Sequence, residues 1–289
     1  MLQLWAGALA NGVLMGVVYA LVALGLTVLF GVMRVVNFAH GQMVVTGMYL
    51  GYVCSERFGL SVLPAAAGTA VAMFGFGYVL QRCLVQGFIS RPQHAQFILF
   101  IGVALALTGL QLVVFGPDAQ TAFSAASFDV IAVGPLSLDR SRVEAAGAAA
   151  VIMAGLVALL RFSPLGRAMR AAADNPLGGA VVGLNIPRIY ALTSGLAAAC
   201  AGAAGALVAP IFDTQPFLAT DFTLVAFVIV IVGGLGSLAG AMLGGILIGV
   251  GETLAALLVD PALKTAFSYL LLVGVLLVRP AGLFRARFA

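Results

Sequence analysis

The sequence RFSPLGRAMRAAADNPLGGAVVGLNIPR, residues 161–188, is a polar interruption between two long apolar parts of the chain. It holds four arginines and a single acid, Asp174. In membrane proteins, arginines gather beside apolar spans on the cytoplasmic side. The stretch therefore predicts one or two short helices outside the bilayer, on its positively charged side. An ordinary cytoplasmic loop is the alternative.

Sequence signals within this stretch predict where its helices begin and end. Ser163 followed by Pro164 predicts a helix start, because serine caps first-turn amides and proline fits the first helical position. A short helix is expected over Gly166–Ala173, stopped by Asn175-Pro176 and the two glycines after them. A second helical piece, from about Gly179 to Leu184, is expected to end before Pro187.

Composition places the chain in the membrane. Of its 289 residues, 63% are hydrophobic and 8% are charged, whereas about a quarter of the residues of soluble domains are charged. The chain holds one lysine, Lys264, and no basic run of the kind that binds nucleic acid. Its three scattered cysteines give neither a disulfide framework nor metal-ligand spacing. We therefore predict an all-α, polytopic transmembrane helical bundle.

Nine apolar runs are candidate spans. They are Leu9–Gly31, Met43–Cys54, Leu60–Leu80, Phe97–Phe115, Val143–Leu160, Ile189–Ala209, Thr223–Val232, Leu238–Val259 and Ala266–Val278. Met43–Cys54 and Thr223–Val232 are short for a full span, and short segments are tolerated at membrane depth only when protein buries them. The first run lacks a basic leader and is expected to be retained.

The basic residues predict an orientation. If the 161–188 loop is inside, ten of the fourteen arginine and lysine residues fall inside, including Arg285 and Arg287. The N-terminus is then outside and the C-terminus inside, with nine crossings, or eight if the short runs merge differently. We expect residues 1–289 to form a single transmembrane domain, with a cytoplasmic loop at 161–188 and an extracytoplasmic loop at 116–142. In the outer loop, Phe128–Val133 resembles a strand of a small hairpin, but a solvated loop is favoured.

Two features of the C-terminal half call for interpretation. The pattern Gly234-x-Gly236-x-x-Ala239 after an apolar run imitates a dinucleotide-binding loop. We reject that interpretation because membrane spans flank it, and expect a break in a transmembrane helix, with a helix N-terminus near Ser237. Glu252 is the single acid within a predicted span, which makes it a functional candidate. Pairing with an arginine at a subunit contact, or a place near the outer interface, is favoured over a proton relay.

The stretch Gly25–Tyr49, GLTVLFGVMRVVNFAHGQMVVTGMY, is the most distinctive. The first helix is expected to end near Gly31, with Asn37 capping the next helical segment. His40-Gly41 predicts a tight turn. A lone histidine is more often a hydrogen-bonded structural residue than a ligand.

Several motifs together resemble the permease subunits of bacterial branched-chain amino acid ABC importers, along essentially the whole chain. They are Gly25-Leu26-Thr27, Phe30-Gly31-Val32, Asn37-Phe38-Ala39-His40-Gly41, Gly166-Arg167-Ala168-Met169-Arg170-Ala171, Asp174-Asn175-Pro176, Gly183-Leu184-Asn185, Tyr190-Ala191-Leu192-Thr193, Gly233-Gly234-Leu235-Gly236-Ser237 with Gly240-Ala241, and Arg279-Pro280-x-Gly282-Leu283-Phe284. The chain is similar to the shorter, all-membrane subunit of the permease pair.

This resemblance implies roles for particular residues. The 163–187 segment corresponds to the cytoplasmic coupling loop that docks on an ATPase subunit, through Gly166, Arg167, Ala168, Arg170, Ala173 and Gly183. The signature residues, which are candidates for the transport path, are Arg34, Asn37, His40, Gly41, Gly234, Gly236 and Ser237. One departure is Leu177-Gly178-Gly179, where the family usually has an acid and two alanines; the glycines are expected to shorten the helix.

The resemblance also implies partners and cargo. We expect a homologous second permease subunit, two ATPase subunits, an extracytoplasmic substrate-binding protein and the bilayer of a bacterial inner membrane. The chain itself has no P-loop and is expected to have no cofactor and no enzymatic activity. Leucine, isoleucine or valine is the implied cargo. A urea or short-amide importer is the alternative, and an ion-coupled secondary transporter working alone ranks below it.

Overall fold

A computed structural model of the chain describes residues 2–122, 129–133, 136–258, 264–280 and 282–284. Its regular elements are α1 (Leu2–Met33), α2 (His40–Phe58), α3 (Val62–Cys83), the 3-10 helix η1 (Val85–Phe88), α4 (Gln93–Phe115), β1 (Val130–Val133), β2 (Leu136–Asp139), α5 (Arg140–Phe162), α6 (Pro164–Asp174), α7 (Pro176–Val181), α8 (Ile186–Val208), η2 (Pro216–Leu218), α9 (Ala219–Gly233), α10 (Leu238–Leu258) and α11 (Lys264–Val278). Phe128 of the predicted strand, and Arg285 and Arg287, lie outside the described residues.

Each of the nine apolar runs corresponds to one helix, which confirms the all-α polytopic class. Within the described ranges, seven helical segments are long and apolar enough to cross a membrane: α1, α3, α4, α5, α8, η2 with α9, and α10. The last helix, α11, has a shorter apolar stretch, Ala266–Val278. The remaining run forms α2, which is 19 residues long and buries ten of them.

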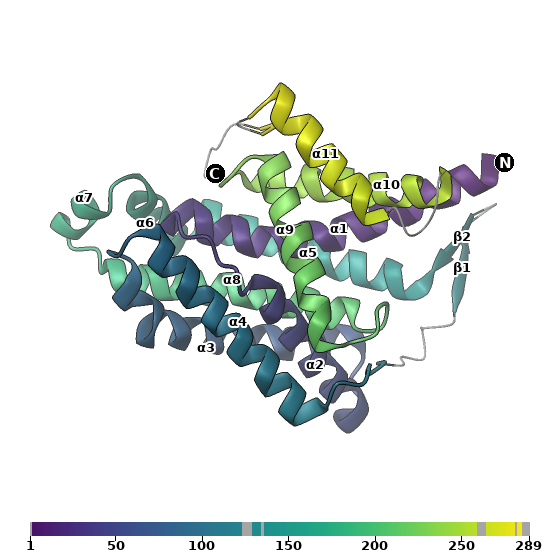
Figure 1. Cartoon of the computed structure of the whole chain (residues 1–289), viewed down its shortest axis with the longest axis horizontal. Helices are drawn as coiled ribbons and strands as arrows, with labels where there is room; N and C mark the ends of the chain where they lie inside the picture. The colour runs from purple at the N-terminus through teal and green to yellow at the C-terminus, as the bar shows by residue number, and fades with distance from the viewer. Residues whose placement is uncertain (1, 123–128, 134–135, 259–263, 281, 285–289) are drawn as a thin grey trace.

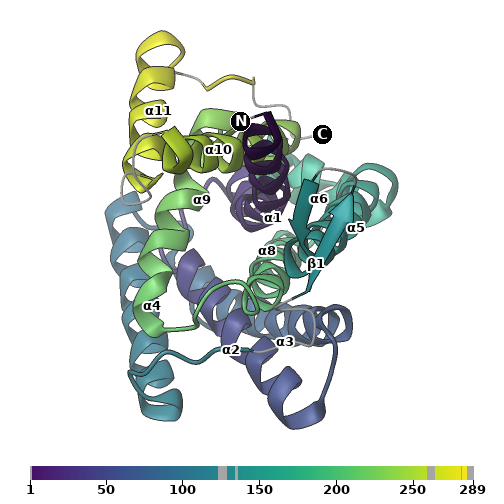
Figure 2. The ribbon, with the colours of Figure 1, turned by 90° about the vertical axis from the view of Figure 1, so that its right-hand side faces the viewer.

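The helices α1 and α8 lie at the centre of the bundle. Small residues let the helices around them approach closely: a Cβ added at Gly16 of α1 would lie 2.6 Å from the Cα atom of Ile246 in α10. By contrast, α4 exposes most of its length, including Leu105 and Val113. Figure 2 shows α4 and α11 along one side of the bundle and α5 on the other.

The 116–142 loop contains a small hairpin, the alternative that the sequence favours less. In it, β1 pairs antiparallel with β2, with Val130 opposite Asp139 and Val133 opposite Leu136. Arg140 links the start of the hairpin to α5, because its guanidinium lies 2.9 Å from the carboxylate of Asp129 and 2.9 Å from the carboxylate of Glu144. The favoured interpretation, a solvated loop without strands, is therefore wrong for this part of the loop.

The 161–188 stretch folds as a pair of capped helices. The Ser163 hydroxyl accepts a hydrogen bond from the Gly166 amide at 3.0 Å, which confirms the predicted helix start. The second helix, α7, begins at Pro176 and not at Gly179. The reason is that the Asn175 side chain accepts from the Gly178 amide at 2.9 Å, so the Asn-Pro pair that ends α6 also starts α7.

The next helix, α8, begins earlier than the apolar run that predicts it. Its cap is Asn185, whose side chain accepts from the Arg188 amide at 3.0 Å, so Pro187 lies within the first turn of the helix. In Figure 1, α6 and α7 lie at one end of the elongated molecule, and the N-terminus and the β1–β2 hairpin lie at the other. This arrangement is compatible with the predicted orientation, which stays a prediction.

Candidate functional site

The signature stretch places the start of α2 deep inside the bundle. After α1 ends at Met33, the chain runs back beside it through a non-helical linker, 34–37, and Arg34 has φ +54°. The Nε2 atom of His40 then donates to the carbonyl oxygen of Val22 at 2.8 Å. Val22 lies eleven residues before Met33, which is ~16 Å along a helix. Irregular backbone at such depth is tolerated only where protein buries it.

Asn37 shapes the turn into α2. Its side-chain oxygen accepts from the Ala39 amide at 2.9 Å, and its amide nitrogen lies 3.6 Å from the sulfur of Met43. The residue at the cap position is Ala39, so Asn37 acts two residues earlier than a helix cap. The turn itself falls at Phe38–Ala39. The prediction of a tight turn at His40-Gly41 is therefore wrong, because both residues are already helical.

His40 and Gly41 attach this helix start to two others. His40 is 1% exposed and bonds to α1, as a structural histidine does. The Gly41 amide donates to the Thr223 hydroxyl of α9 at 3.1 Å. A Cβ at Gly41 would collide with the carbonyl oxygen of Ala219, so a glycine lets the two helices touch here. These two residues position the start of α2 and fasten it to its neighbours.

A polar cluster beside this start was not foreseen. It consists of Gln42 and Thr46 on α2 and Thr108 and Gln111 on α4. The Gln42 side chain donates to the Thr108 hydroxyl at 2.6 Å, and the Gln111 side chain donates to the Thr46 hydroxyl at 3.0 Å. The side-chain oxygens of both glutamines are buried and accept no hydrogen bond from the described residues. An amide within the apolar run that holds Gln111 was the signal that could have pointed to it.

The predicted break near Ser237 is a tight connection between α9 and α10. Gly234 and Gly236 have φ +102° and +81°, values that glycine adopts readily. The Ser237 hydroxyl accepts from the Gly240 amide at 3.1 Å at the start of α10. The run before the glycines is α9, a helix and not a strand, which confirms the rejection of a dinucleotide fold.

Other signature residues meet this connection. A Cβ added at Gly236 would lie 3.5 Å from the Cα atom of Gly31, near the end of α1. From the C-terminal motif, the Leu283 amide donates to the Val232 carbonyl at 2.8 Å. Three motifs that are far apart in the sequence therefore come together at one end of α1.

Glu252 is buried and hydrogen-bonded. Its carboxylate accepts from the Tyr19 hydroxyl of α1 at 3.3 Å and from the Ser268 hydroxyl of α11 at 2.9 Å. Sequence reasoning foresaw neither hydroxyl. The carboxylate thus links α10 to a central helix and to a peripheral one. Among the described residues, no cluster of histidine, cysteine, aspartate and glutamate could hold a metal ion.

The residues expected to dock an ATPase divide into two groups. Gly166 is buried, and its missing side chain makes room for the Leu160 carbonyl, to which the Arg170 guanidinium also donates. These two residues fasten α6 to α5. Ala168 and Ala173 are half-buried, whereas Arg167 and Gly183 are exposed.

The neighbouring helix α7 exposes an apolar tip, which sequence reasoning missed. It consists of Leu177, Val181 and Val182, which are 80%, 87% and 77% exposed. The tip lies on the outermost helix at one end of the molecule (Figure 1). Exposed apolar patches of this kind mark interaction sites.

The fold and these sites define a class of protein: a multi-pass helical membrane protein with buried polar residues between its spans and a short helical pair at one end. Residues 8–276 match the family described as branched-chain amino acid transport system / permease component. The chain belongs to this family and is therefore a transport subunit, not an enzyme.

Curated relatives agree over nearly the full length. The chain is 28% identical over 286 residues to the high-affinity branched-chain amino acid transport system permease protein LivH of Salmonella typhimurium, which covers 94% of this chain and 93% of that protein. It is 28% identical over 295 residues to the permease protein BraD of Pseudomonas aeruginosa, covering 95% and 94%. A probable LivH of Methanocaldococcus jannaschii is 25% identical over 280 residues, covering 91% and 87%. No solved structure matches the chain.

Proposed function

We propose that this chain carries branched-chain amino acids across a bacterial inner membrane as one permease of an ABC importer. The full-length match to permeases of branched-chain amino acid transport systems carries this proposal. The family implies ATPase and binding-protein partners. The proposed complex contains this chain, a homologous second permease, two ATPase subunits and an extracytoplasmic binding protein.

The pair α6–α7 is the proposed docking site for an ATPase subunit. Its apolar tip, Leu177 with Val181 and Val182, is suited to a hydrophobic cleft, and the exposed Arg167 is suited to an acidic partner. Gly166 and Arg170 contribute by holding α6 against the end of α5. Movement of the ATPase is thereby passed directly to a membrane-crossing helix.

The transport path is proposed to run beside the start of α2. A helix N-terminus inside the membrane favours a carboxylate through its partial positive charge. The side-chain oxygens of Gln42 and Gln111 are suited to accept hydrogen bonds from an ammonium group. His40 and Gly41 hold these groups in place through α1 and α9.

One experiment tests the whole proposal. The tagged chain is purified from native membranes, its partners are identified, and the complex is reconstituted with its binding protein in liposomes. We expect ATP-dependent uptake of radiolabelled leucine, and co-purification of ATPase subunits and a second permease. Uptake of urea without uptake of leucine would show that urea, and not a branched-chain amino acid, is the cargo. A chain that purifies alone and drives uptake without ATP would overturn the proposal in favour of a secondary transporter.

A further inference from the structure

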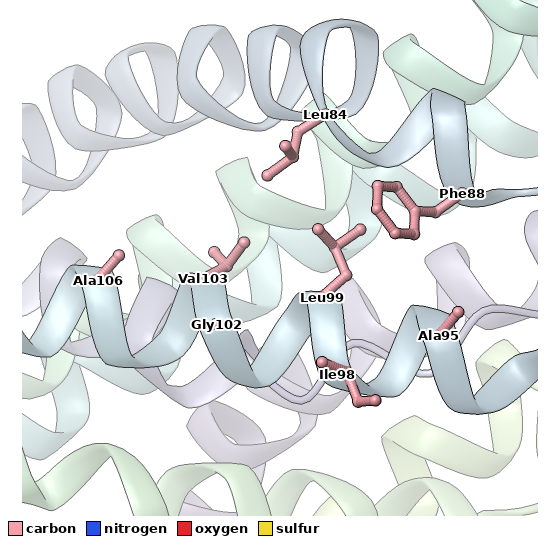
Figure 3. A pocket seen from close by; sticks show the side chains of 8 residues that line it. All are labelled: Leu84, Phe88, Ala95, Ile98, Leu99, Gly102, Val103 and Ala106. Atoms are coloured by element: carbon pink, nitrogen blue, oxygen red, sulfur yellow. The ribbon is translucent and has the colours of Figure 1, made fainter.

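An apolar groove of about 490 Å³ lies between the end of α3 and the first half of α4. In Figure 3, Leu84 and Phe88 point toward it from the connection between the two helices, and Leu99 and Val103 point toward it from α4. Every residue that lines it is apolar. Its volume is within the range of about 300–1,000 Å³ that is usual for small-molecule sites.

Two arginines flank the connection at one end of the groove. Arg82 lies in the last turn of α3, two residues before Leu84. The guanidinium of Arg91 lies 4.9 Å from the ring centroid of Phe88, which lines the groove. No acid occurs between residues 57 and 117 of the sequence, and in the described part of the chain neither arginine forms an ion pair. The connection joins two helices that are long and apolar enough to cross a membrane, so we expect both charges at the level of lipid headgroups.

We propose that this groove binds one acyl chain of an anionic phospholipid, whose phosphate group is held by Arg82 and Arg91. The groove supplies an apolar slot along α4, and the arginines supply the complementary charge. Basic sites between membrane-crossing helices bind anionic headgroups in this way. The site is separate from the polar cluster on α2 and α4 and from α6–α7, so it does not depend on the proposed transport function.

The charge beside the groove favours a lipid over an apolar protein segment. An anionic headgroup complements Arg82 and Arg91, neither of which forms an ion pair in the described part of the chain.

Selectivity must come from the headgroup. An acyl chain that enters the groove leaves one apolar environment for another, so the slot itself gives little preference between lipids. An arginine near the membrane surface strengthens binding of an anionic lipid by about fivefold. The two arginines together are therefore expected to favour phosphatidylglycerol over phosphatidylcholine by about 25-fold.

The chain offers a matched control. A second groove, of about 530 Å³, lies between α3 and α5, and Glu144 is among the residues that line it. Among the described residues, no arginine or lysine lines this groove, and its carboxylate lies 2.9 Å from the guanidinium of Arg140. Gly102 lines the first groove and Gly147 the second, and nothing lies within 4 Å of a Cβ added at either. Leucine at either position therefore places a larger side chain in its groove and raises the helix propensity.

The test uses the full-length chain in nanodiscs of phosphatidylcholine with a minor fraction of phosphatidylglycerol. Native mass spectrometry measures the ratio of the two lipids that the chain retains after mild delipidation. We expect the wild type to retain phosphatidylglycerol preferentially, and R82Q/R91Q to lose this preference by about 25-fold. Gly102→Leu is expected to lose the retained phosphatidylglycerol, and Gly147→Leu is expected to keep the wild-type ratio.

Other outcomes overturn the proposal. An unchanged ratio in R82Q/R91Q would show that the arginines do not hold the headgroup. An equal loss in Gly147→Leu would show non-selective lipid at the protein surface. If Gly102→Leu keeps its lipid but no longer co-purifies with a second permease subunit, the groove is a subunit contact instead.

Discussion

The Nε2 atom of His40 lies 2.8 Å from the carbonyl oxygen of Val22, and this bond joins the first turn of α2 to the middle of α1. It spans the linker that contains Arg34 and Asn37. The histidine therefore helps to hold the first turn of α2 at its depth in the bundle.

We predict that His40→Ala destabilises the protein and lowers uptake. A hydrogen bond between membrane helices contributes about 0.6–1.7 kcal/mol, and the buried cavity adds to this loss. The measurement is thermal unfolding of the purified complex, together with leucine uptake. His94→Ala is the control because His94 is exposed, and it should behave as wild type. Equal behaviour of the two variants would refute the role of His40.

Gly41→Ala is expected to separate α2 from α9. The added Cβ would collide with the Ala219 carbonyl, and relief of such overpacking costs about 1–3 kcal/mol. Cysteine cross-linking between the two helices would report the separation as a lower yield. Gly68→Ala serves as the control, since nothing lies within 4 Å of its added Cβ. A normal cross-linking yield in Gly41→Ala would contradict the close contact.

Charge reversal at Arg167 should weaken docking of the ATPase. The side chain is exposed on α6 and takes no part in fastening α6 to α5, so Arg167→Glu should leave membrane insertion intact. Co-purification of the ATPase measures the effect, which should be larger at low salt because exposed charges are screened. Arg188→Glu tests whether any exposed arginine of the loop has the same effect. Normal recovery of the ATPase with Arg167→Glu would count against the docking role.

The apolar tip of α7 should contribute more than this charge. Leu177→Ser with Val181→Ser removes two side chains that are 80% and 87% exposed, so folding should be unaffected. Each apolar side chain of this size is worth roughly 1.5–3 kcal/mol when fully buried at an interface. The affinity of the ATPase for the reconstituted chain should fall by at least tenfold, and a surface-binding assay measures this change. Retained affinity with lost ATP-driven uptake would instead assign the tip to coupling after docking.

Glu252 should tolerate glutamine better than leucine. Glutamine keeps an acceptor for the Tyr19 and Ser268 hydroxyls, whereas leucine leaves both without this partner inside the bundle. Glu252→Leu is therefore expected to lower thermal stability by about 1–3 kcal/mol and Glu252→Gln by less. If uptake falls equally in both variants while stability is kept, the carboxylate takes part in transport directly.

Composition and hydropathy predicted the membrane class and the positions of the nine helices that the apolar runs form. Local chemistry predicted the cap at Ser163, because serine followed by proline has one usual meaning. Asn175-Pro176 was interpreted only as a stop, although the same pair also starts a helix. The depth at which α2 begins could not be predicted, because it depends on Val22 and Thr223, whose contacts with α2 are made in the folded bundle.

The roles assigned to the signature residues stay predictions. The motif residues were chosen by resemblance, and the structure brings Gly31, Gly236 and Leu283 together. Thr108 and Gln111 were passed over because they are isolated polar residues in one apolar run, and only the packing of α4 on α2 brings them to Gln42 and Thr46.

The anchoring of α2 also sets an order for biogenesis. The Gly41 amide and its partner, the Thr223 hydroxyl, are 182 residues apart in the chain. At a synthesis rate of about 5–20 residues per second, Thr223 leaves the ribosome ~9–36 s after Gly41. During this interval the first turn of α2 lacks one of its partners. It therefore reaches its final position in the bundle only after α9 has been made.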